Sequence, residues 1–359
     1  MRIFSFFILL LAISSSCKPS YQESSAPEEH LYLFKDLNPS EVTQITITSP
    51  YQILNFHLQP DHSWTIAERD DYPADNLAIA DLLSSFAEIK ILDRLPVSQE
   101  NLPRLGLAPP TPPSDEINTT EGTRITLKSP TQTYSALIGH LKTSQSEAST
   151  MFGAHYDGQR LALLDQDPNH ALSINHALKE LTTNVAYWID SRFFTASSVK
   201  TLSLIKEDIP SWTLQRSEPE DRFTLAGEKD TLPNLTEFID YLFFTFRIHD
   251  VLPSSESLAK PVAHSYRIET FSGLNFEILI GPLIAVSAEE QAYRDSITGF
   301  LRPANITSLR TIQVTSNNAA PHLSKNKLPR LDTPYLVQLP QLNQLILTRP
   351  ELLLFETRL

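Results

Sequence analysis

Glycine is scarce in this sequence, and its spacing excludes two kinds of nucleotide site. Nine glycines occur in 359 residues, and no two of them are separated by a single residue. Loops that cradle phosphates need closely spaced glycines, because the backbone must approach the phosphate. Walker and dinucleotide-binding fingerprints are therefore absent, and we expect neither a nucleotide partner nor a cofactor.

Positive charge is also limited. The chain has 29 lysines and arginines against 42 aspartates and glutamates, which gives a formal net charge of -13. Binding to the phosphate backbone of a nucleic acid needs clustered lysine and arginine, and the sequence has no such cluster. We therefore expect no nucleic acid partner.

Cysteine occurs once, directly after a predicted signal peptide. Residues 1–16 combine a positive start at Arg2, an apolar run from Ile3 to Ile13 and three serines. This run is too short for a good transmembrane helix of about 20 residues. Cys17 follows where bacterial lipoprotein precursors carry the cysteine that is lipidated, so the sequence predicts a lipid on Cys17, with acyl chains such as palmitate. The alternative is an ordinary signal peptide that leaves Cys17 as an unpaired thiol.

The residues around Cys17 indicate where such a lipoprotein would stay. Lys18 replaces the aspartate of the familiar inner-membrane retention signal, which favours the outer membrane, although Ser14 stands where leucine is usual. Residues 17–40 begin with a polar stretch that is typical of a tether. We expect a lipid-anchored protein of the bacterial cell envelope that faces the periplasm. The rest of the sequence contains no run of 18 apolar residues, so we expect no transmembrane helix there.

One block of sequence occurs twice. Trp64–Pro96 contains a short strand, a charged turn, a helix and the segment Ile91-Leu92-Asp93-Arg94-Leu95-Pro96. In the second block, Phe223–Leu225 takes the place of the strand, and Ile248-His249-Asp250-Val251-Leu252-Pro253 takes the place of the closing segment. Such a repeat indicates a duplicated scaffold.

A second pair of matches supports the duplication. The strands expected at 124–127 and 134–139 recur in the same order at 267–270 and 276–281. The chain also exceeds the size at which one hydrophobic core stops growing. We therefore predict an α+β protein of two related halves, each a mostly antiparallel sheet with one principal helix packed on it. The first repeat spans 41–198, and the second spans 199–359 with a divergent C-terminal tail.

Hydrophobic periodicity predicts the elements of the first half. Apolar residues at every second position predict strands around 45–47, 54–58 and 64–66. Asp75 is suited to cap a helix, and apolar residues at spacings of three and four follow it, namely Ile79, Leu82, Leu83, Phe86 and Ile89. We also expect a hairpin over 151–164 that turns at Asp157-Gly158, and a helix from about Asn169 to Leu181.

The second half follows the same scheme before its tail. Strands are expected at 199–204, 212–215 and 223–226, and a helix from about Asn234 to Phe246. The tail has expected strands at 311–315 and 335–339, a short helix from Pro340 and a last apolar run over 352–355.

These features resemble a bacterial family of unknown function. The residues that carry the resemblance are Trp64–Ile66, Tyr72–Asp75, Leu82–Leu83, Leu105–Leu107, Tyr134–Gly139 and Tyr187–Phe194. Together they resemble the domain-of-unknown-function family numbered 4340, over roughly residues 42 to 290. The resemblance implies an envelope protein anchored at its N-terminus, often encoded beside an ABC-type transport system of the gliding-motility type. It implies no active site, and many members have a transmembrane helix where this chain has a lipoprotein-like signal.

Two groups of residues could suggest a metal, but neither has the right spacing. The ten histidines are scattered without an H-E-x-x-H motif, and His170 and His176 lie off a common helical face. The run Asp165-Gln166-Asp167-Pro168-Asn169 begins like a calcium loop, yet His170 stands where glycine is needed and no glutamate closes it. We expect no metal site, and a polar loop between the hairpin and the helix.

An acidic turn precedes the first principal helix and contains Glu68, Asp70, Asp71 and Asp75. Paired carboxylates about 5 to 9 Å apart across a cleft could hydrolyse glycosides. Acidic residues before a helix also favour its N-terminal dipole, which needs no substrate, and we favour this interpretation. The aromatic residues Trp64, Tyr187, Trp188, Phe193 and Trp212 could line a ligand groove, but their strand positions favour the core.

The leading functional prediction is a non-enzymatic cell-envelope lipoprotein that acts as a scaffold or accessory subunit, with a protein partner in the envelope. The alternative is a periplasmic hydrolase or carbohydrate-binding protein that uses the acidic turn around residues 68–75. The crease between the two halves is the expected place for a partner surface, because clefts at domain junctions are common binding sites.

Overall fold

The structure is a computed structural model of the 359-residue chain. It describes residues 31–112, 120–140, 160–178, 180–191, 199–245, 248–252, 264–285, 308–316, 334–338 and 348–358. The chain divides into two compact units, Met1–Leu31 and Tyr32–Leu359. All helices and strands given below belong to the second unit. Cys17 and the predicted signal peptide and tether up to His30 lie outside the described residues.

A nine-stranded sheet forms the first half, in the order β4-β3-β2-β1-β6-β7-β8-β9-β5. Every strand pair in it is antiparallel. The strands are β1 (Gln44–Thr48), β2 (Ile53–Leu58), β3 (Trp64–Ile66), β4 (Tyr72–Pro73), β5 (Ile91–Pro96), β6 (Thr123–Lys128), β7 (Thr133–Ile138), β8 (Arg160–Leu164) and β9 (Asp167–Ile174). The predicted meander over the first three strands is confirmed.

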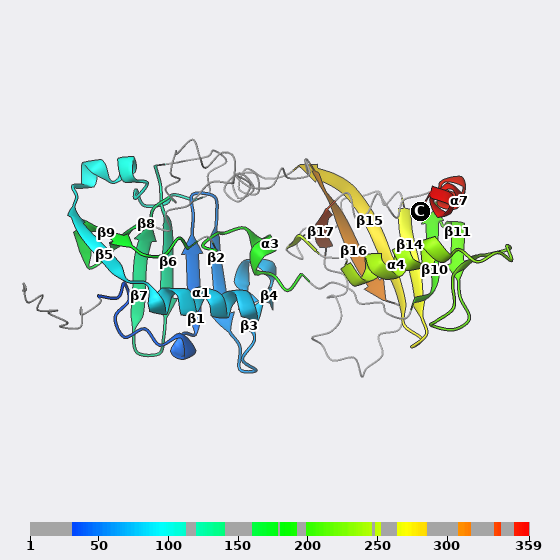
Figure 1. Ribbon diagram of the computed structural model, residues 1–359, viewed down its shortest axis with the longest axis horizontal. Coiled ribbons are helices and arrows are strands. Elements are labelled where there is room, and N and C mark those ends of the chain that lie inside the picture. The colour runs from blue at the N-terminus through cyan, green and yellow to red at the C-terminus, as the bar shows by residue number, and fades with distance from the viewer. Residues whose placement is uncertain are drawn as a thin grey trace, which may run out of the picture. The chain divides into compact units, whose positions relative to one another are not determined.

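The principal helix of this half, α1 (Asn76–Glu88), lies across the sheet (Figure 1). Its apolar stripe, predicted from spacings of three and four, is buried against the strands. The side chain of Asp75 accepts hydrogen bonds from the backbone N–H groups of Leu77 and Ala78, so the predicted N-cap is confirmed. Ile89, the C-cap residue directly after the helix, is also buried.

An eight-stranded antiparallel sheet forms the second half, in the order β12-β11-β10-β14-β15-β16-β17-β13. Its principal helix, α4 (Pro233–Thr245), lies across it in the same way (Figure 1). The strands are β10 (Val199–Lys206), β11 (Ile209–Gln215), β12 (Thr224–Leu225), β13 (Asp250–Val251), β14 (His264–Thr270), β15 (Asn275–Ala285), β16 (Ser308–Ser316) and β17 (Pro334–Gln338).

The two sheets repeat strand by strand. Reading β3-β2-β1-β6-β7-β8-β9-β5 beside β12-β11-β10-β14-β15-β16-β17-β13 gives the same order of chain segments, and only β4 has no named counterpart. The strands of the tail, β16 and β17, therefore occupy the positions of β8 and β9. Each half also continues after its last strand into a further helix, α3 (Val185–Trp188) or α7 (Arg349–Arg358). The α+β fold of two related halves is confirmed.

The helix predicted over residues 169–181 is wrong, because Asp167–Ile174 is strand β9, paired with β8 and β5. This part of the sheet is buried on both faces. Leu172 and Ile174 join the main core, while Ala171 packs in a second cluster on the other face. Strands buried on both faces lack clean alternation, and the leucines that follow imitate helical spacing. Of the predicted hairpin over 151–164, the turn at 157–158 lies outside the described residues.

Candidate functional site at the junction of the two halves

The acidic turn reverses the chain tightly between β3 and β4. It consists of a single 3₁₀ turn, η2 (Ala67–Arg69), followed by Asp70 and Asp71, which both have a positive φ. Aspartate tolerates the left-handed conformation better than most residues, because its short side chain can hydrogen-bond locally. The two consecutive aspartates therefore suit a reversal of this kind.

The carboxylates of this turn hold the local fold together. Glu68 accepts hydrogen bonds from the backbone N–H of Asn55 at 2.8 Å and from its side-chain amide at 2.5 Å, which fixes the turn to β2. Asp71 accepts a hydrogen bond from the Thr65 hydroxyl at 3.4 Å. Asp75 caps α1, as described above. The predicted acidic turn thus exists, and Glu68, Asp71 and Asp75 each have a structural partner.

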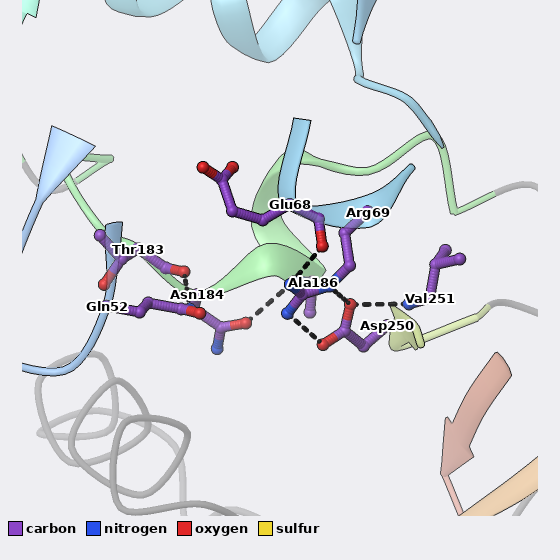
Figure 2. A network of polar contacts seen from close by, with 8 residues as sticks. All are labelled: Gln52, Glu68, Arg69, Thr183, Asn184, Ala186, Asp250 and Val251. Atoms are coloured by element: carbon purple, nitrogen blue, oxygen red, sulfur yellow. Dashed lines mark hydrogen bonds and ion pairs between the residues drawn. The ribbon is translucent and has the colours of Figure 1, made fainter. Parts of the chain in front are cut away.

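A bidentate ion pair extends from this turn to the second half (Figure 2). Arg69 Nε lies 2.8 Å from Asp250 Oδ1, and Arg69 Nη2 lies 2.9 Å from Oδ2. The arginine and aspartate side chains are only 14% and 18% exposed. Because charged hydrogen bonds of this fork geometry are both strong and directional, the pair fixes the η2 turn against β13.

Two further contacts accompany the ion pair. The rings of Tyr72 on β4 and Tyr335 on β17 meet edge to face, with centroids 6.1 Å apart. The backbone N–H of Ile248 donates to the carbonyl of Ser191 at 3.1 Å. Both tyrosines are buried. The junction thus combines a charged contact, an aromatic contact and a backbone hydrogen bond.

The segment around α3 supports the junction from the first half. Gln52 Nε2 donates to the carbonyl of Thr183 at 2.5 Å, and Asn184 caps α3 through the N–H of Ala186 (Figure 2). The N–H of Asp75 donates to the carbonyl of Trp188 at 2.6 Å. The start of α1, the acidic turn and α3 therefore form one hydrogen-bonded block.

A comparison with protein families identifies the scaffold. A family described as Domain of unknown function (DUF4340) matches residues 64–262, more than half of the chain. The chain belongs to the DUF4340 family. The matched range includes both Arg69 and Asp250 of the junction. No curated protein and no solved structure matches the chain.

The Arg69–Asp250 pair in this DUF4340 protein is not predicted from the sequence. A signal was present, because Asp93 and Asp250 occupy the same position in the two matched closing segments. The choice of Arg69 as the partner, however, depends on how the halves pack. The predicted aromatic core is confirmed for Trp64, Trp188 and Trp212, all of which are buried, whereas Phe193 lies outside the described residues.

A second polar group lies at the start of β8. Arg160 Nη1 donates to the carbonyl of Leu178 at 3.0 Å. Burial lowers the pKa of the Arg160 guanidinium to about 10, although Glu180 opposes this shift. Within the described part of the chain, Arg160 Nε and Glu180 Oε1 are buried without a hydrogen-bond partner. Leu178 adopts a left-handed φ of 44° between them in sequence.

The metal candidates within the described residues make other contacts. Among the residues that the structure describes, no three histidine, cysteine, aspartate or glutamate side chains gather as they would around a metal ion. His170 Nδ1 instead lies 2.7 Å from Asp167 Oδ1. The run that begins like a calcium loop forms the β8–β9 turn and the start of β9, so the loop joins two strands and leads to no helix.

In the ranges that the structure covers, no helix is both long and apolar enough to cross a membrane.

Proposed function

We propose that this DUF4340 protein is a cell-envelope lipoprotein, anchored through a lipid on Cys17, that acts as a non-enzymatic scaffold or accessory subunit. It faces the periplasm, with the outer membrane favoured, and serves an envelope complex such as an ABC-type transport system. The observation that carries the proposal is the use of the acidic turn. Glu68, Asp71 and Asp75 hold β2, β3 and α1 in place, and Arg69 between them binds the second half.

The same observation weighs against a hydrolase. Glycoside hydrolysis needs one carboxyl group that donates a proton and a second that acts as base or nucleophile across a cleft. In this protein the carboxylates of the acidic turn are instead occupied as hydrogen-bond acceptors for Asn55, Thr65 and the first N–H groups of α1. The acidic turn is therefore better suited to a rigid binding platform than to proton transfer.

The function is tested with the full chain isolated from its native membrane under mild detergent. We expect defined envelope proteins, including transporter subunits, to co-purify in fixed ratio, and the Cys17→Ala variant to lose them. The control is Asp81→Asn, an exposed residue on α1. An activity on envelope glycans that disappears in Asp70→Asn or Asp71→Asn, with folding retained, would overturn the proposal in favour of a hydrolase.

The anchor is tested separately by intact-mass analysis of the mature protein. A lipid-sized mass increment on Cys17, absent from Cys17→Ala, is expected. An unmodified chain that begins near Cys17 would contradict the anchor and make the protein a soluble exported one.

A further inference from the structure

The surface of β13 that is covered at the junction has an exposed counterpart on a strand of the first half. In the second half, Asp250 on β13 is bound by Arg69 of the first half. The corresponding strand of the first half is β5, which lies at the sheet edge and, among the described strands, pairs only with β9. Asp93 takes the place of Asp250 in the repeat. Every residue of β5 after Ile91 is exposed.

The two aspartates share the same local geometry. Asp250 Oδ1 accepts a hydrogen bond from the N–H of the next residue, Val251, at 2.6 Å. Asp93 Oδ1 accepts one from the N–H of Arg94 at 2.8 Å. On either side of Asp93, the leucine side chains of Leu92 and Leu95 are 52% and 41% exposed. Leu92, Asp93 and Leu95 together form what we call the β5 surface.

A surface complementary to the β5 surface is exposed to solvent in the second half. The turn after β12 corresponds to the acidic turn, and it carries an exposed cation, Lys229. Beside it, α7 is fastened by the ion pair between Arg349 and Glu228, 2.8 Å apart. Two leucines of α7, Leu353 and Leu354, are 40% and 53% exposed. Lys229, Leu353 and Leu354 form what we call the α7 surface.

From these surfaces we infer that two copies of this chain associate head to tail, the β5 surface of one copy against the α7 surface of the other. Lys229 of one copy would then meet Asp93 of the next. In the repeat, Glu228 takes the place of Arg69, and Arg349 already binds this glutamate within the chain. Repeats that end an array usually present a polar outer face. Here the β5 surface exposes two leucines beside a negative charge, and the α7 surface exposes two leucines beside a positive charge. This inference does not depend on the proposed function or on lipidation.

The expected contact uses side chains rather than strand extension. β5 has a bulge between Ile91 and Asp93 and ends at Pro96, which has no N–H to donate. Both features disfavour the addition of another strand at a sheet edge. At the junction within the chain, the ion pair with Asp250 is likewise made through the Arg69 side chain. Because the two surfaces differ, the association is heterologous and can continue into rings or longer arrays.

Sedimentation equilibrium of the full chain carrying Cys17→Ser tests this inference. We expect association that strengthens with concentration, and Asp93→Lys or Lys229→Glu to weaken it about tenfold, because like charges then face each other. The double variant should restore it, and Asp81→Lys should leave it unchanged. A monomer at every concentration up to about 100 µM, or association that neither charge change affects, would overturn the inference.

Disulfide cross-linking then tests the direction of the contact, since the Cys17→Ser chain has no other cysteine. Chains with Leu95→Cys and chains with Leu354→Cys are mixed, each with its own affinity tag. Cross-links between the two kinds of chain are expected, and none with Leu77→Cys, a residue of α1 that is 76% exposed. Cross-links only between like chains, or only to another protein, would contradict the head-to-tail contact.

Discussion

The ion pair between Arg69 and Asp250 joins residues that are far apart in the sequence at a place where water has little access. Both oxygens of the aspartate are engaged, and one of them also accepts the N–H of Val251. Loss of either partner leaves the other charge poorly solvated and without the two hydrogen bonds of the pair. The energetic cost of such a loss exceeds that at an exposed pair.

Asp250→Ala is therefore expected to lower the free energy of unfolding by about 2 kcal/mol, because hydrogen bonds to charged groups contribute about 1.5–3 kcal/mol. Arg69→Ala should have a similar effect, and the double variant should cost little more than either. Denaturant unfolding of all four proteins gives the coupling energy. The matched control is Arg349 with Glu228, each 50% exposed, for which coupling below about 1 kcal/mol is expected. Equal coupling in the two pairs would contradict the prediction.

Asp167, at the start of β9, makes a pH-dependent contribution to the free energy of unfolding. Its hydrogen bond with His170, and then that with Arg94, lowers the pKa of the Asp167 carboxyl below its usual 3.8. A carboxyl group with a lowered pKa in the folded state stabilises the protein above the unfolded pKa, and this stabilisation is lost as the pH falls through the folded pKa.

We therefore expect the unfolding free energies of the wild type and Asp167→Asn to differ at pH 6 and to converge as the pH falls below about 4. Urea unfolding at a series of pH values measures this. Asp61 in an exposed loop provides a comparison, because hydrogen bonds from Ser63, and not from His170 or Arg94, lower the pKa of its carboxyl. Asp61→Asn is therefore measured beside Asp167→Asn. A constant difference down to pH 2 would show that His170 and Arg94 do not act through the charge of Asp167.

At the level of elements, the helices illustrate what local sequence can and cannot predict. The limits of α1 follow from Asp75 and an apolar stripe, because both signals lie within the element itself. The prediction of a helix over β9 is wrong, since the burial of this strand on both faces comes from a loop that packs behind the sheet, with Leu102 and Leu107. Such a contact is tertiary and leaves no periodic signal in β9.

The start of α4 also differs from that of α1. Its first N–H groups, those of Asn234 and Leu235, donate to the carboxylate of Glu356 on α7, at 3.2 and 2.8 Å. In α1 the corresponding cap comes from Asp75, directly before the helix. A negative charge in either place favours the helix N-terminus, but only the cap from Glu356 also links two helices.

Glu356→Ala is expected to cost about 1 kcal/mol of stability, the usual contribution of an N-cap, and also to loosen α7. Asp75→Ala should cost a similar amount without affecting α7. Hydrogen exchange of α7 amides distinguishes the two variants, since only Glu356→Ala should accelerate it. Equal exchange in both variants would show that Arg349 and the buried Leu352 hold α7 without the cap.

For the molecule as a whole, the main core cluster contains buried residues of both halves, and a smaller cluster lies behind the first sheet. Trp188 reports on the first half and Trp212 on the second, and both are buried. A shared core predicts cooperative unfolding, in which probes in different places report one transition.

Variants that retain only Trp188 or only Trp212 are therefore expected to give the same unfolding midpoint by fluorescence. Adding Arg69→Ala and Tyr72→Ala to both should separate the midpoints, because these changes remove the charged and aromatic contacts of the junction. Each variant is compared with its own parent. Separate midpoints before the junction is altered would contradict a shared core.

The duplicated architecture could be predicted because Trp64–Pro96 and its second copy preserve turn residues and strand patterns. The acidic turn could be predicted as well, and so could the role of Asp75 as a cap. The contacts of the junction could not, since the pairing of Arg69 with Asp250 requires the packing of two halves. The correspondence of β16 and β17 with β8 and β9 could not be predicted either, because strands that match in position need not match in sequence.

The position of the last strand in each sheet has a consequence for biosynthesis. In the sheets as described, β5 pairs with β9 alone and β13 with β17 alone, so each edge strand leaves the ribosome long before its neighbour. The helices α1 and α4 are also made before the strands that complete their sheets. Pairings between distant segments slow folding, so β5 and β13 remain open to chaperones or wrong partners in the meantime. The second half acquires its edge only once Pro334–Gln338 has been synthesised, and its helix cap only once Glu356 has followed.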